Sequence, residues 1–461
     1  AIADQFTKNT VIVTYTGLAD QTEALVEKLK ALKADKTDDN VKSVCETFLN
    51  ARAWWEKSEA FLFGAASDFG IDPHIDSWPL DLDGLLDEMK NTSHITAMEA
   101  EDADVWAGVK LGPELLGFHG IEYIIFEAGS PKAVSKIKDK ELTYAIAVAG
   151  DLRNKCYQLQ ISWAGVDNVD ANRVTKVVDE LEWNTTVAGG ENSYTQNMML
   201  AGQVGSTYTS WTGAMQAIID GCKTIADEVG TSKIGKPHTG EDKNYIESPY
   251  SYNSITDFYD NIISIQNAYM GGIEGQRDES KSLHNYMASV NADLDTKMIH
   301  AITSALVGNG PRCMMLKDGT AVVPTYFSDT LNIVDLNTAN VQSVAMVKNR
   351  TENRIQRGEK YFNDAAHCFQ NWQSCNGCHP GDARMDAMNW DLMNDGVGNS
   401  KNCKSLLFSH PTPPSMISGI RETAEHAVRA GFKFIQFFDI TEEDAVCVDA
   451  YLKSLRPVPS P

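Results

Sequence analysis

The spacing of hydrophobic residues along the chain changes near residue 307. From Leu18 to about Val307, apolar residues recur with helical spacing almost throughout. The predicted helices are one that starts at Asp38-Asp39-Asn40 and others over 113–127, 135–163, 192–228, 254–271 and 280–306. Several exceed 25 residues, a length typical of antiparallel bundles. The pattern predicts a mainly α fold with two helical-bundle subdomains, 1–190 and 191–308, the second apparently incomplete.

The pattern beyond residue 308 is different. Short β-rich runs cover 320–325, 331–336 and 341–347, and they match one antiparallel sheet of a propeller blade. One blade cannot close a propeller, so the segment 309–350 must pack on another part of the molecule. Helical spacing returns at Asn353, and we expect 351–461 to form a cytochrome c-like helical domain around a loop-rich cysteine cluster.

Composition restricts the partners that the protein can have. The 461 residues are 43% hydrophobic and carry a formal net charge of -23. A surface this negative repels phosphate backbones and anionic lipid headgroups, which disfavours nucleic acid and membrane-surface roles. No window approaches the roughly 18 uncharged apolar residues of a transmembrane helix. The chain opens Ala1-Ile2-Ala3-Asp4 without Met, as expected for a processed, exported product.

The most specific motif is Cys375-Asn376-Gly377-Cys378-His379. Two thiols three residues apart on a helical turn reach the two vinyl groups of haem, and the adjoining imidazole then lies under the iron. The motif predicts one haem c attached through Cys375 and Cys378, with His379 as an axial ligand. Because this attachment occurs outside the cytoplasm, it supports a periplasmic or cell-envelope location.

Two other roles for this motif, and the state of two nearby cysteines, remain open. A zinc site would need Cys368 and Cys403 as further ligands, and a redox dithiol would need a βαβ context that is missing. Cys368 and Cys403 are either a disulfide that braces the haem pocket or two thiols.

Several motifs flank the haem motif in order. Arg357-Gly358 opens a helical segment, Asn389-Trp390-Asp391-Leu392 follows the motif, and Thr412-Pro413-Pro414-Ser415-Met416 comes later. Residues 311–461 thus resemble the haem-bearing part of bacterial β-propeller proteins related to di-haem cytochrome c peroxidases. This chain has a single CxxCH, so it cannot run two-haem peroxidase chemistry alone. For the sixth iron ligand we favour Met416, with His410 as the alternative.

The helical half carries a weaker motif, Gly117-Phe118-His119-Gly120-Ile121-Glu122. His119 and Glu122 lie three residues apart and so share one face of a helix that Pro113 could open. Imidazole and carboxylate together bind a divalent metal or act as an acid–base pair. Alone the motif is weak, because about 1.4 such His-x-x-acid pairs arise by chance in this composition. A buried histidine bonded to its own helix's glutamate is the structural alternative.

The surrounding segments add to this motif. Residues 52–61, 75–81 and 247–254, together with GxHxxE, resemble the imelysin family, and the likeness covers about 10–306. That family is all-helical, exported and linked to iron uptake, and some members have been called metallopeptidases. The resemblance implies that His119 and Glu122 bind iron or another divalent metal, with Glu59, Asp76 and Trp78 as neighbours.

We therefore expect an exported bacterial protein that handles iron or haem and carries a c-type haem for electron transfer to a partner protein. It would reside in the periplasm or at the cell-envelope surface. One alternative is an imelysin-type metallopeptidase, although no HExxH is present. Another is an electron-transfer cytochrome whose helical body is a docking scaffold. Enzymatic activity, redox or proteolytic, stays open on these residues.

Overall fold

The computed structural model describes the chain in ordered stretches with short gaps. They are residues 1–239, 241–242, 245–306, 315–317, 319–328, 330–335, 341–346, 352–368, 374–385, 389–390, 401–416 and 419–457. Within these stretches no helix is long and apolar enough to cross a membrane.

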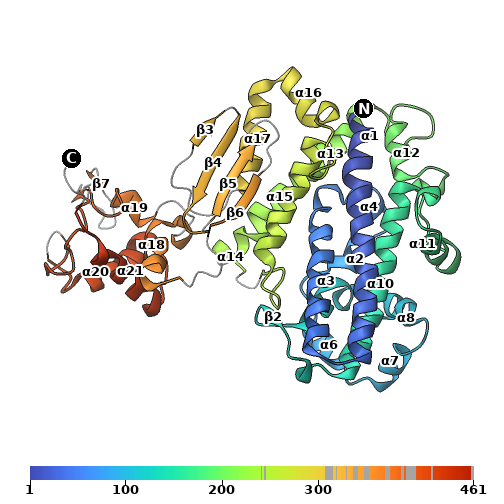
Figure 1. The fold of residues 1–461 in the computed structure, drawn as a ribbon, viewed down its shortest axis with the longest axis horizontal. Helices are drawn as coiled ribbons and strands as arrows, with labels where there is room; N and C mark the ends of the chain where they lie inside the picture. The colour runs from blue at the N-terminus through green and yellow to red at the C-terminus, as the bar shows by residue number, and fades with distance from the viewer. Residues whose placement is uncertain are drawn as a thin grey trace.

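Three long helices form the centre of the helical body. They are α2 (Val13–Ala34), α3 (Asp38–Glu56) and α10 (Asp139–Ala164), which pack side by side (Figure 1). Helix α3 begins where the Thr37 hydroxyl accepts a hydrogen bond from the Asn40 amide, as an N-cap does. Its apolar residues on the side that faces the core are buried: Val41, Val44, Phe48, Ala51 and Trp55.

Short helices connect α3 to α10 and bring the GxHxxE motif against the bundle. They are α4 (Ala65–Asp68), α5 (Asp72–Asp76), α6 (Leu82–Glu88), α7 (Thr92–Ala97), α8 (Ala103–Lys110) and α9 (Gly117–Ile125). We predicted that Pro113 opens the motif helix. In the structure it opens a separate 3-10 turn, Pro113–Leu115. The chain leaves that turn at Leu116 in an extended conformation, so α9 begins only at Gly117.

The later helices are α12 (Tyr194–Met199), α13 (Trp211–Glu228), α15 (Ser254–Met270), α16 (Leu283–Val290) and α17 (Ala292–Leu306). Of the later predicted helices, 254–271 is confirmed by α15, whereas 192–228 and 280–306 are each divided into two shorter helices. The single helix predicted over 192–228 is wrong, because a loop separates α12 from α13. Gly202 and Gly205 adopt positive φ there, and the Asn197 side chain binds the backbone of Thr207. Buried apolar residues from Ala3 to Leu306 form one continuous core across both predicted bundles.

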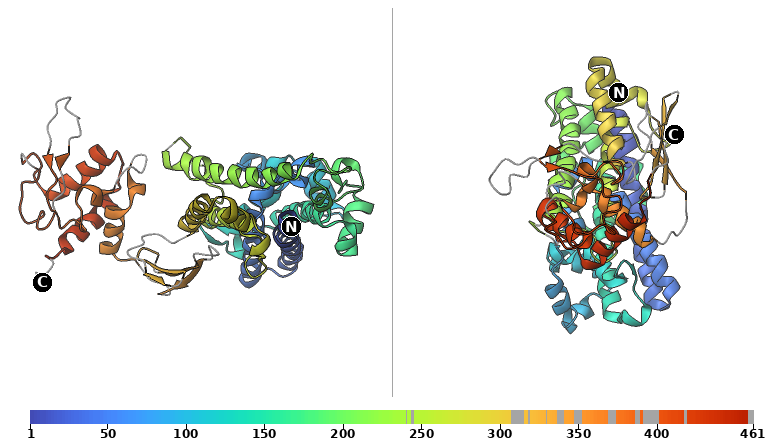
Figure 2. Two further views of the ribbon diagram at one scale, coloured as in Figure 1. Left: turned by 90° about the horizontal axis from the view of Figure 1, so that it is seen from above. Right: turned by 90° about the vertical axis from the view of Figure 1, so that its left-hand side faces the viewer.

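A four-stranded antiparallel sheet follows the helical body. Its strands pair in chain order: β3 (Met315–Lys317), β4 (Thr320–Thr325), β5 (Thr330–Asp335) and β6 (Val341–Ala345). Three of them coincide with the predicted β-rich runs. Ala321 pairs with Val334 in the register, and both are buried in a small cluster on one face. Figure 2 shows this sheet between the helical body and the C-terminal part.

The C-terminal part has its own small core. Helices α18 (Arg354–Asn363) and α21 (Glu442–Ser454) pack against each other, with α19 (Cys375–Cys378) and α20 (Ala424–Gly431) beside them. A Cβ atom at Gly358 would lie 1.9 Å from the Cys447 carbonyl oxygen, so only glycine permits this close crossing of α18 and α21. The core members include Phe362, Phe432, Val448, Tyr451 and Leu452.

Candidate functional site

The start of α9 determines where the GxHxxE side chains lie. Gly117 has a φ of +73°, in the left-handed region, and the backbone of Ile75 in α5 leaves no room for a side chain there. The motif's first glycine therefore allows α9 to pack directly on α5. This contact brings His119 next to Asp76, which closes α5.

His119 is buried among groups from three segments. Its Nε2 lies 2.8 Å from Asp76 Oδ1, and its ring packs on that of Trp78 with centroids 4.8 Å apart. The contact with Asp76 is an ion pair when the imidazole is protonated. Burial acts to lower the pKa of His119, but the carboxylates of Asp76 and Glu122 outweigh it and raise the pKa above its usual value.

Glu122 joins α9 to the segment 247–254. Its Oε1 accepts hydrogen bonds from the Ser251 amide at 2.9 Å and the Ser251 hydroxyl at 2.6 Å. Its Oε2 lies 3.9 Å from His119 Nδ1, is fully buried, and accepts no hydrogen bond from the described residues. His119 and Glu122 thus share one face of α9, as predicted. Glu122 Oε2, the oxygen that accepts no hydrogen bond from the described residues, faces the His119 ring.

Arg52 lies at the centre of the site. This guanidinium, 1% exposed, forms an ion pair with Asp76 and lies 2.6 Å from Glu56 Oε1 and 3.1 Å from Glu247 Oε1. Asp76 also accepts a 2.8 Å hydrogen bond from Trp55 Nε1. Burial acts to raise the pKa of Asp76, yet Arg52 and His119 hold it well below its usual range. Asp76 is therefore ionised at neutral pH.

A second buried cation, Lys233, contacts the same acids. Its Nζ is 2.9 Å from Glu247 Oε1 and 3.9 Å from Glu56 Oε2. Burial, opposed by Arg52, raises the pKa of Glu56 well above its usual value, and burial likewise raises the pKa of Asp257 to about 6. Burial therefore favours the protonated form of both carboxyl groups.

The buried charges of this cluster do not cancel. Its carboxyl groups outnumber its two permanent cations, Arg52 and Lys233, even with His119 protonated. The carboxyl groups are Glu56, Asp76, Glu122, Glu247 and Asp257. Buried charge is costly unless it is paired, so the excess must be met by bound protons or by a bound cation.

The sequence identified part of this site. Asp76 and Trp78 lie beside His119 as expected, and Glu59 is half-buried near Asp76 and Glu247. Burial, helped by Asp76 and Glu247, raises the pKa of Glu59 to about 8. Sequence reasoning gave no role to Arg52, Glu56, Asp257 or Lys233. One signal was present, because Arg52 and Glu56 are charged residues four apart on the apolar face of α3.

The described part of the chain contains one group of three or more potential metal-ligating side chains close together. Glu56, Asp76 and Glu247 each place a carboxylate oxygen within 4.8 Å of the others. Carboxylate oxygens suit hard cations, and an imidazole nitrogen nearby extends the donor set to iron and zinc. Asp76 belongs to this group and also contacts His119, so it links the three carboxylates to the imidazole.

The CxxCH motif occupies a turn of helix in the C-terminal part. His379 Nδ1 lies 2.7 Å from the backbone oxygen of Lys404. A carbonyl oxygen only accepts hydrogen bonds, so Nδ1 carries the proton and Nε2 keeps its lone pair. Burial lowers the pKa of His379, which also favours the neutral ring. Burial raises the pKa of Cys375 to about 12 and that of Cys378 to about 11, so both are protonated thiols.

The candidate sixth ligands differ in their surroundings. Met416 is 50% exposed and adopts a positive φ in a turn. His410 is buried, and its Nε2 lies 3.2 Å from Asp449 Oδ1, so its ligating nitrogen is already engaged. Cys368 and Cys403 are buried thiols that are not joined by a disulfide.

Comparisons with known proteins agree with the helical part. The family model for imelysin matches residues 11–306. Iron-regulated protein A of Synechococcus elongatus is 25% identical over 266 residues, which cover 58% of this chain and 63% of that relative. The chain therefore spans less than two thirds of this relative's length.

A solved structure shares the helical fold. It is the crystal structure of a protein described as an iron-regulated protein A precursor from Parabacteroides distasonis, with a TM-score of 0.55 and 26% sequence identity. The likeness covers 65% of this chain and 82% of that one.

Proposed function

This chain belongs to the imelysin family, and from that premise we propose that it is an exported iron-handling protein with one c-type haem. Its helical body would bind an iron cation beside His119, and its C-terminal part would carry the haem. A relative named iron-regulated protein A supports the link to iron, and another described as a precursor supports export.

The excess of buried carboxylates is the observation that carries the cation site. A cation bound among Asp76, Glu122 and His119 removes the unfavourable repulsion between these acids, which protons otherwise relieve. Glu122 Oε2 and Glu247 Oε2 are buried oxygens without a hydrogen bond from the described residues, so each is available as a ligand. An oxygen and nitrogen donor set of this kind suits iron.

The neighbouring residues have distinct parts in this proposal. Ser251 fixes Glu122 through Oε1 and leaves Oε2 to the cation. Arg52 holds Asp76, Glu56 and Glu247 together and limits their mutual repulsion. Glu59, with its pKa raised to about 8 by burial, is protonated at neutral pH and can release its proton when a cation arrives.

The C-terminal part fits a covalently held haem. Cys375 and Cys378 lie on one helical turn, and the hydrogen bond to Lys404 directs the lone pair of His379 to Nε2. The tight crossing of α18 and α21 at Gly358 supports a cytochrome-like core. Bound haem c supplies one-electron chemistry, which suits a change in the oxidation state of iron. Met416 stays our preferred sixth ligand, because Asp449 engages His410.

An iron-binding experiment tests the helical site. Equilibrium dialysis of the full chain against Fe²⁺ under anaerobic conditions should give one bound iron, and His119→Ala should weaken binding by about 100-fold. His94→Ala is the matched control, because His94 pairs with Glu88 outside the cluster and is more exposed. Equal iron binding by wild type and His119→Ala would overturn the proposal for this site.

A spectroscopic experiment tests the haem. The visible spectrum of the purified chain, oxidised and then reduced with dithionite, should contain the bands of a six-coordinate c-type haem that survive acid–acetone extraction. Addition of Fe²⁺ to the oxidised protein should reduce the haem in wild type and not in His119→Ala. If the spectrum lacks haem bands after expression with haem maturation proteins, the electron-transfer part of the proposal is wrong.

A further inference from the structure

A second concave site lies behind α5, away from the buried charge cluster. A cavity of about 850 Å³ is bounded by α5, α8, α10 and the turn of π-helix Thr175–Glu180. His74 of α5 lines this cavity, whereas Asp76, two residues later, contacts Arg52 in the cluster. A cavity of this size is large enough for a small organic ligand.

Lys155 lines this cavity, and its partly buried ammonium group lies over an aromatic ring. Its Nζ lies 3.8 Å from the centroid of the Trp183 ring, and it makes no hydrogen bond or ion pair with the described residues. An ammonium group has three N–H donors, and burial lowers the pKa of Lys155 although Asp151 acts to raise it. A ligand carboxylate can take the place of solvent as the acceptor for these donors.

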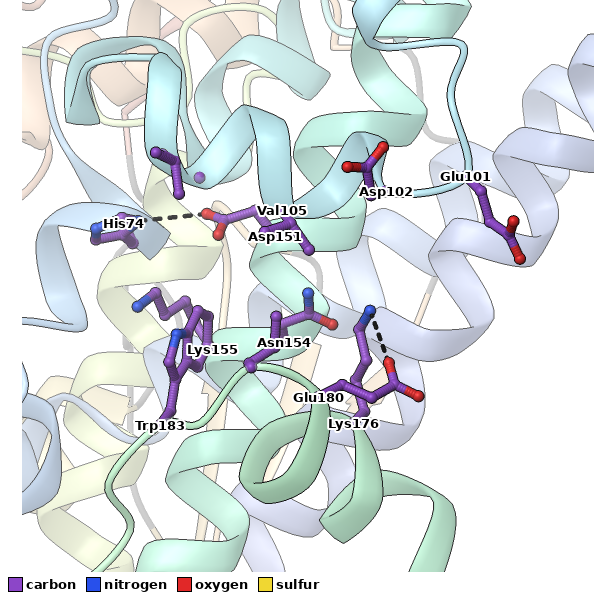
Figure 3. A pocket seen from close by; sticks show the side chains of 13 residues that line it. His74, Glu101, Asp102, Val105, Asp151, Asn154, Lys155, Lys176, Glu180 and Trp183 are labelled. Carbon is purple, nitrogen blue, oxygen red and sulfur yellow. Dashed lines mark hydrogen bonds and ion pairs between the residues drawn. The ribbon is translucent and has the colours of Figure 1, made fainter.

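The opposite end of the cavity is acidic. Glu101 and Asp102 are exposed and lie across the cavity from Lys155 and Trp183 (Figure 3). Neither carboxylate has a hydrogen bond or ion pair among the residues that the structure describes, whereas Glu180 is already paired with Lys176 at 3.3 Å. This end therefore favours a positively charged group.

Apolar side chains also line the cavity. Val105 and Leu181 line the wall of the cavity, and Val109 is 70% exposed at its rim. The lining as a whole has more acidic than basic groups, because Asp151 and Glu180 add to Glu101 and Asp102 against Lys155 and Lys176. A simple anion is consequently disfavoured, and a ligand with both charges fits better.

We propose that this cavity binds a zwitterion of the amino-acid or short-peptide class. The ligand's carboxylate accepts hydrogen bonds from Lys155, its ammonium group faces Glu101 and Asp102, and its apolar side chain packs on Val105 and Leu181. Trp183 holds the Lys155 stem in place by stacking under the ammonium group.

The geometry around Lys155 supports this assignment. Asp151, one turn before Lys155 on α10, is buried and is contacted by His74 Nδ1 at 3.3 Å. That contact holds the Asp151 carboxylate beside His74. The N–H donors of Lys155 are therefore left to face a ligand. The site is separate from the iron proposal, since none of its groups contacts His119 or Glu122.

Calorimetric titration with a dipeptide tests the proposal. The probe is L-leucyl-L-leucine, titrated into the full chain in the presence of EDTA so that metal binding makes no contribution. The N-acetyl derivative lacks the ammonium group, and the C-terminal amide lacks the carboxylate. We expect the dipeptide to bind and each derivative to bind at least about 10-fold more weakly, as loss of one charge-assisted contact implies.

Three variants locate the carboxylate contact. Lys155→Met keeps the stem on Trp183 but removes the charge, and it should weaken dipeptide binding by at least about 10-fold. Lys155→Arg should restore binding, and Lys223→Met, an exposed lysine on α13, is the matched control. Thermal melting within about 2 °C of wild type shows that each variant is folded. Absence of dipeptide binding, equal binding of either derivative, or unchanged binding by Lys155→Met overturns the proposal.

Discussion

Gly117 approaches Ile75 so closely that a Cβ atom at Gly117 would lie 2.1 Å from the Ile75 carbonyl oxygen. The first glycine of GxHxxE is thus a packing requirement, and it sets the distance between His119 and Asp76. The chemistry of the site depends on this contact between α9 and α5, although neither Gly117 nor Ile75 takes part in it.

Gly117→Ala should destabilise the protein by about 2–4 kcal/mol. The added methyl group meets backbone that cannot rotate away, and alanine is strained at a φ of +73°. Gly70→Ala is the matched control, because Gly70 also has a positive φ but nothing lies within 4 Å of its Cβ position. Urea unfolding should give a loss of only about 1–2 kcal/mol for the control. If Gly117→Ala and Gly70→Ala lost the same free energy of unfolding, the close approach to Ile75 would not be a packing requirement.

Cys375→Ala and Cys378→Ala should each reduce covalent haem, measured as haem-linked absorbance in denaturing gels. Each thiol provides one thioether bond, so the double variant should lose covalent haem entirely. Cys222→Ala, which removes a buried thiol from α13 in the helical body, is the control and should retain full haem content. Haem retained by the double variant would contradict attachment at the motif.

The sequence predicted local features of the fold. The spacing of His119 and Glu122 placed them on one helix face, and the β-rich runs predicted the strands β4 and β5, because these patterns depend on neighbouring residues only. The partners of the cluster come from far along the chain. Glu247 and Lys233 reach Arg52 and Glu56 only after α15 packs on α3. No local pattern encodes that packing.

Two predicted features failed for identifiable reasons. The helix expected over 192–228 breaks because the Asn197 side chain binds the Thr207 backbone and competes with helical hydrogen bonds. Pro113 has the residue type of a helix start, yet it begins a 3-10 turn, since α9 can start only where Gly117 fits against α5.

Arg52→Met should cost about 3–5 kcal/mol at pH 7, because it leaves several buried carboxylates without their cation. The deficit should shrink as the pH falls toward 5, since protonation removes the repulsion that Arg52 otherwise balances. Melting temperatures of wild type and variant between pH 5 and 8 measure both effects. Arg357→Met, at a guanidinium with 40% exposure, is the control and should change stability by less than about 1 kcal/mol. A deficit that is independent of pH would indicate lost packing alone.

Glu59→Gln should flatten the dependence of stability on pH between about 5 and 8. Burial, with repulsion from Asp76 and Glu247, raises the pKa of Glu59 to about 8 in the folded state, against about 4.3 in the unfolded chain. Between these values the folded state holds a proton that the unfolded state has lost. The free energy of unfolding therefore falls with rising pH, by up to about 1.4 kcal/mol per unit.

Urea titrations of wild type and Glu59→Gln at several pH values, in EDTA, measure this slope. Glutamine mimics the protonated carboxyl group, so the variant should match wild type near pH 5 and exceed its stability near pH 8. Glu46→Gln, an exposed acid on α3, should leave the slope unchanged and is the control. Because iron beside His119 would replace the proton as the balancing charge, added Fe²⁺ should stabilise wild type more at pH 8 than at pH 6. A wild-type slope as shallow as that of the variant would mean that Glu59 is ionised in the fold and that other groups carry the excess protons.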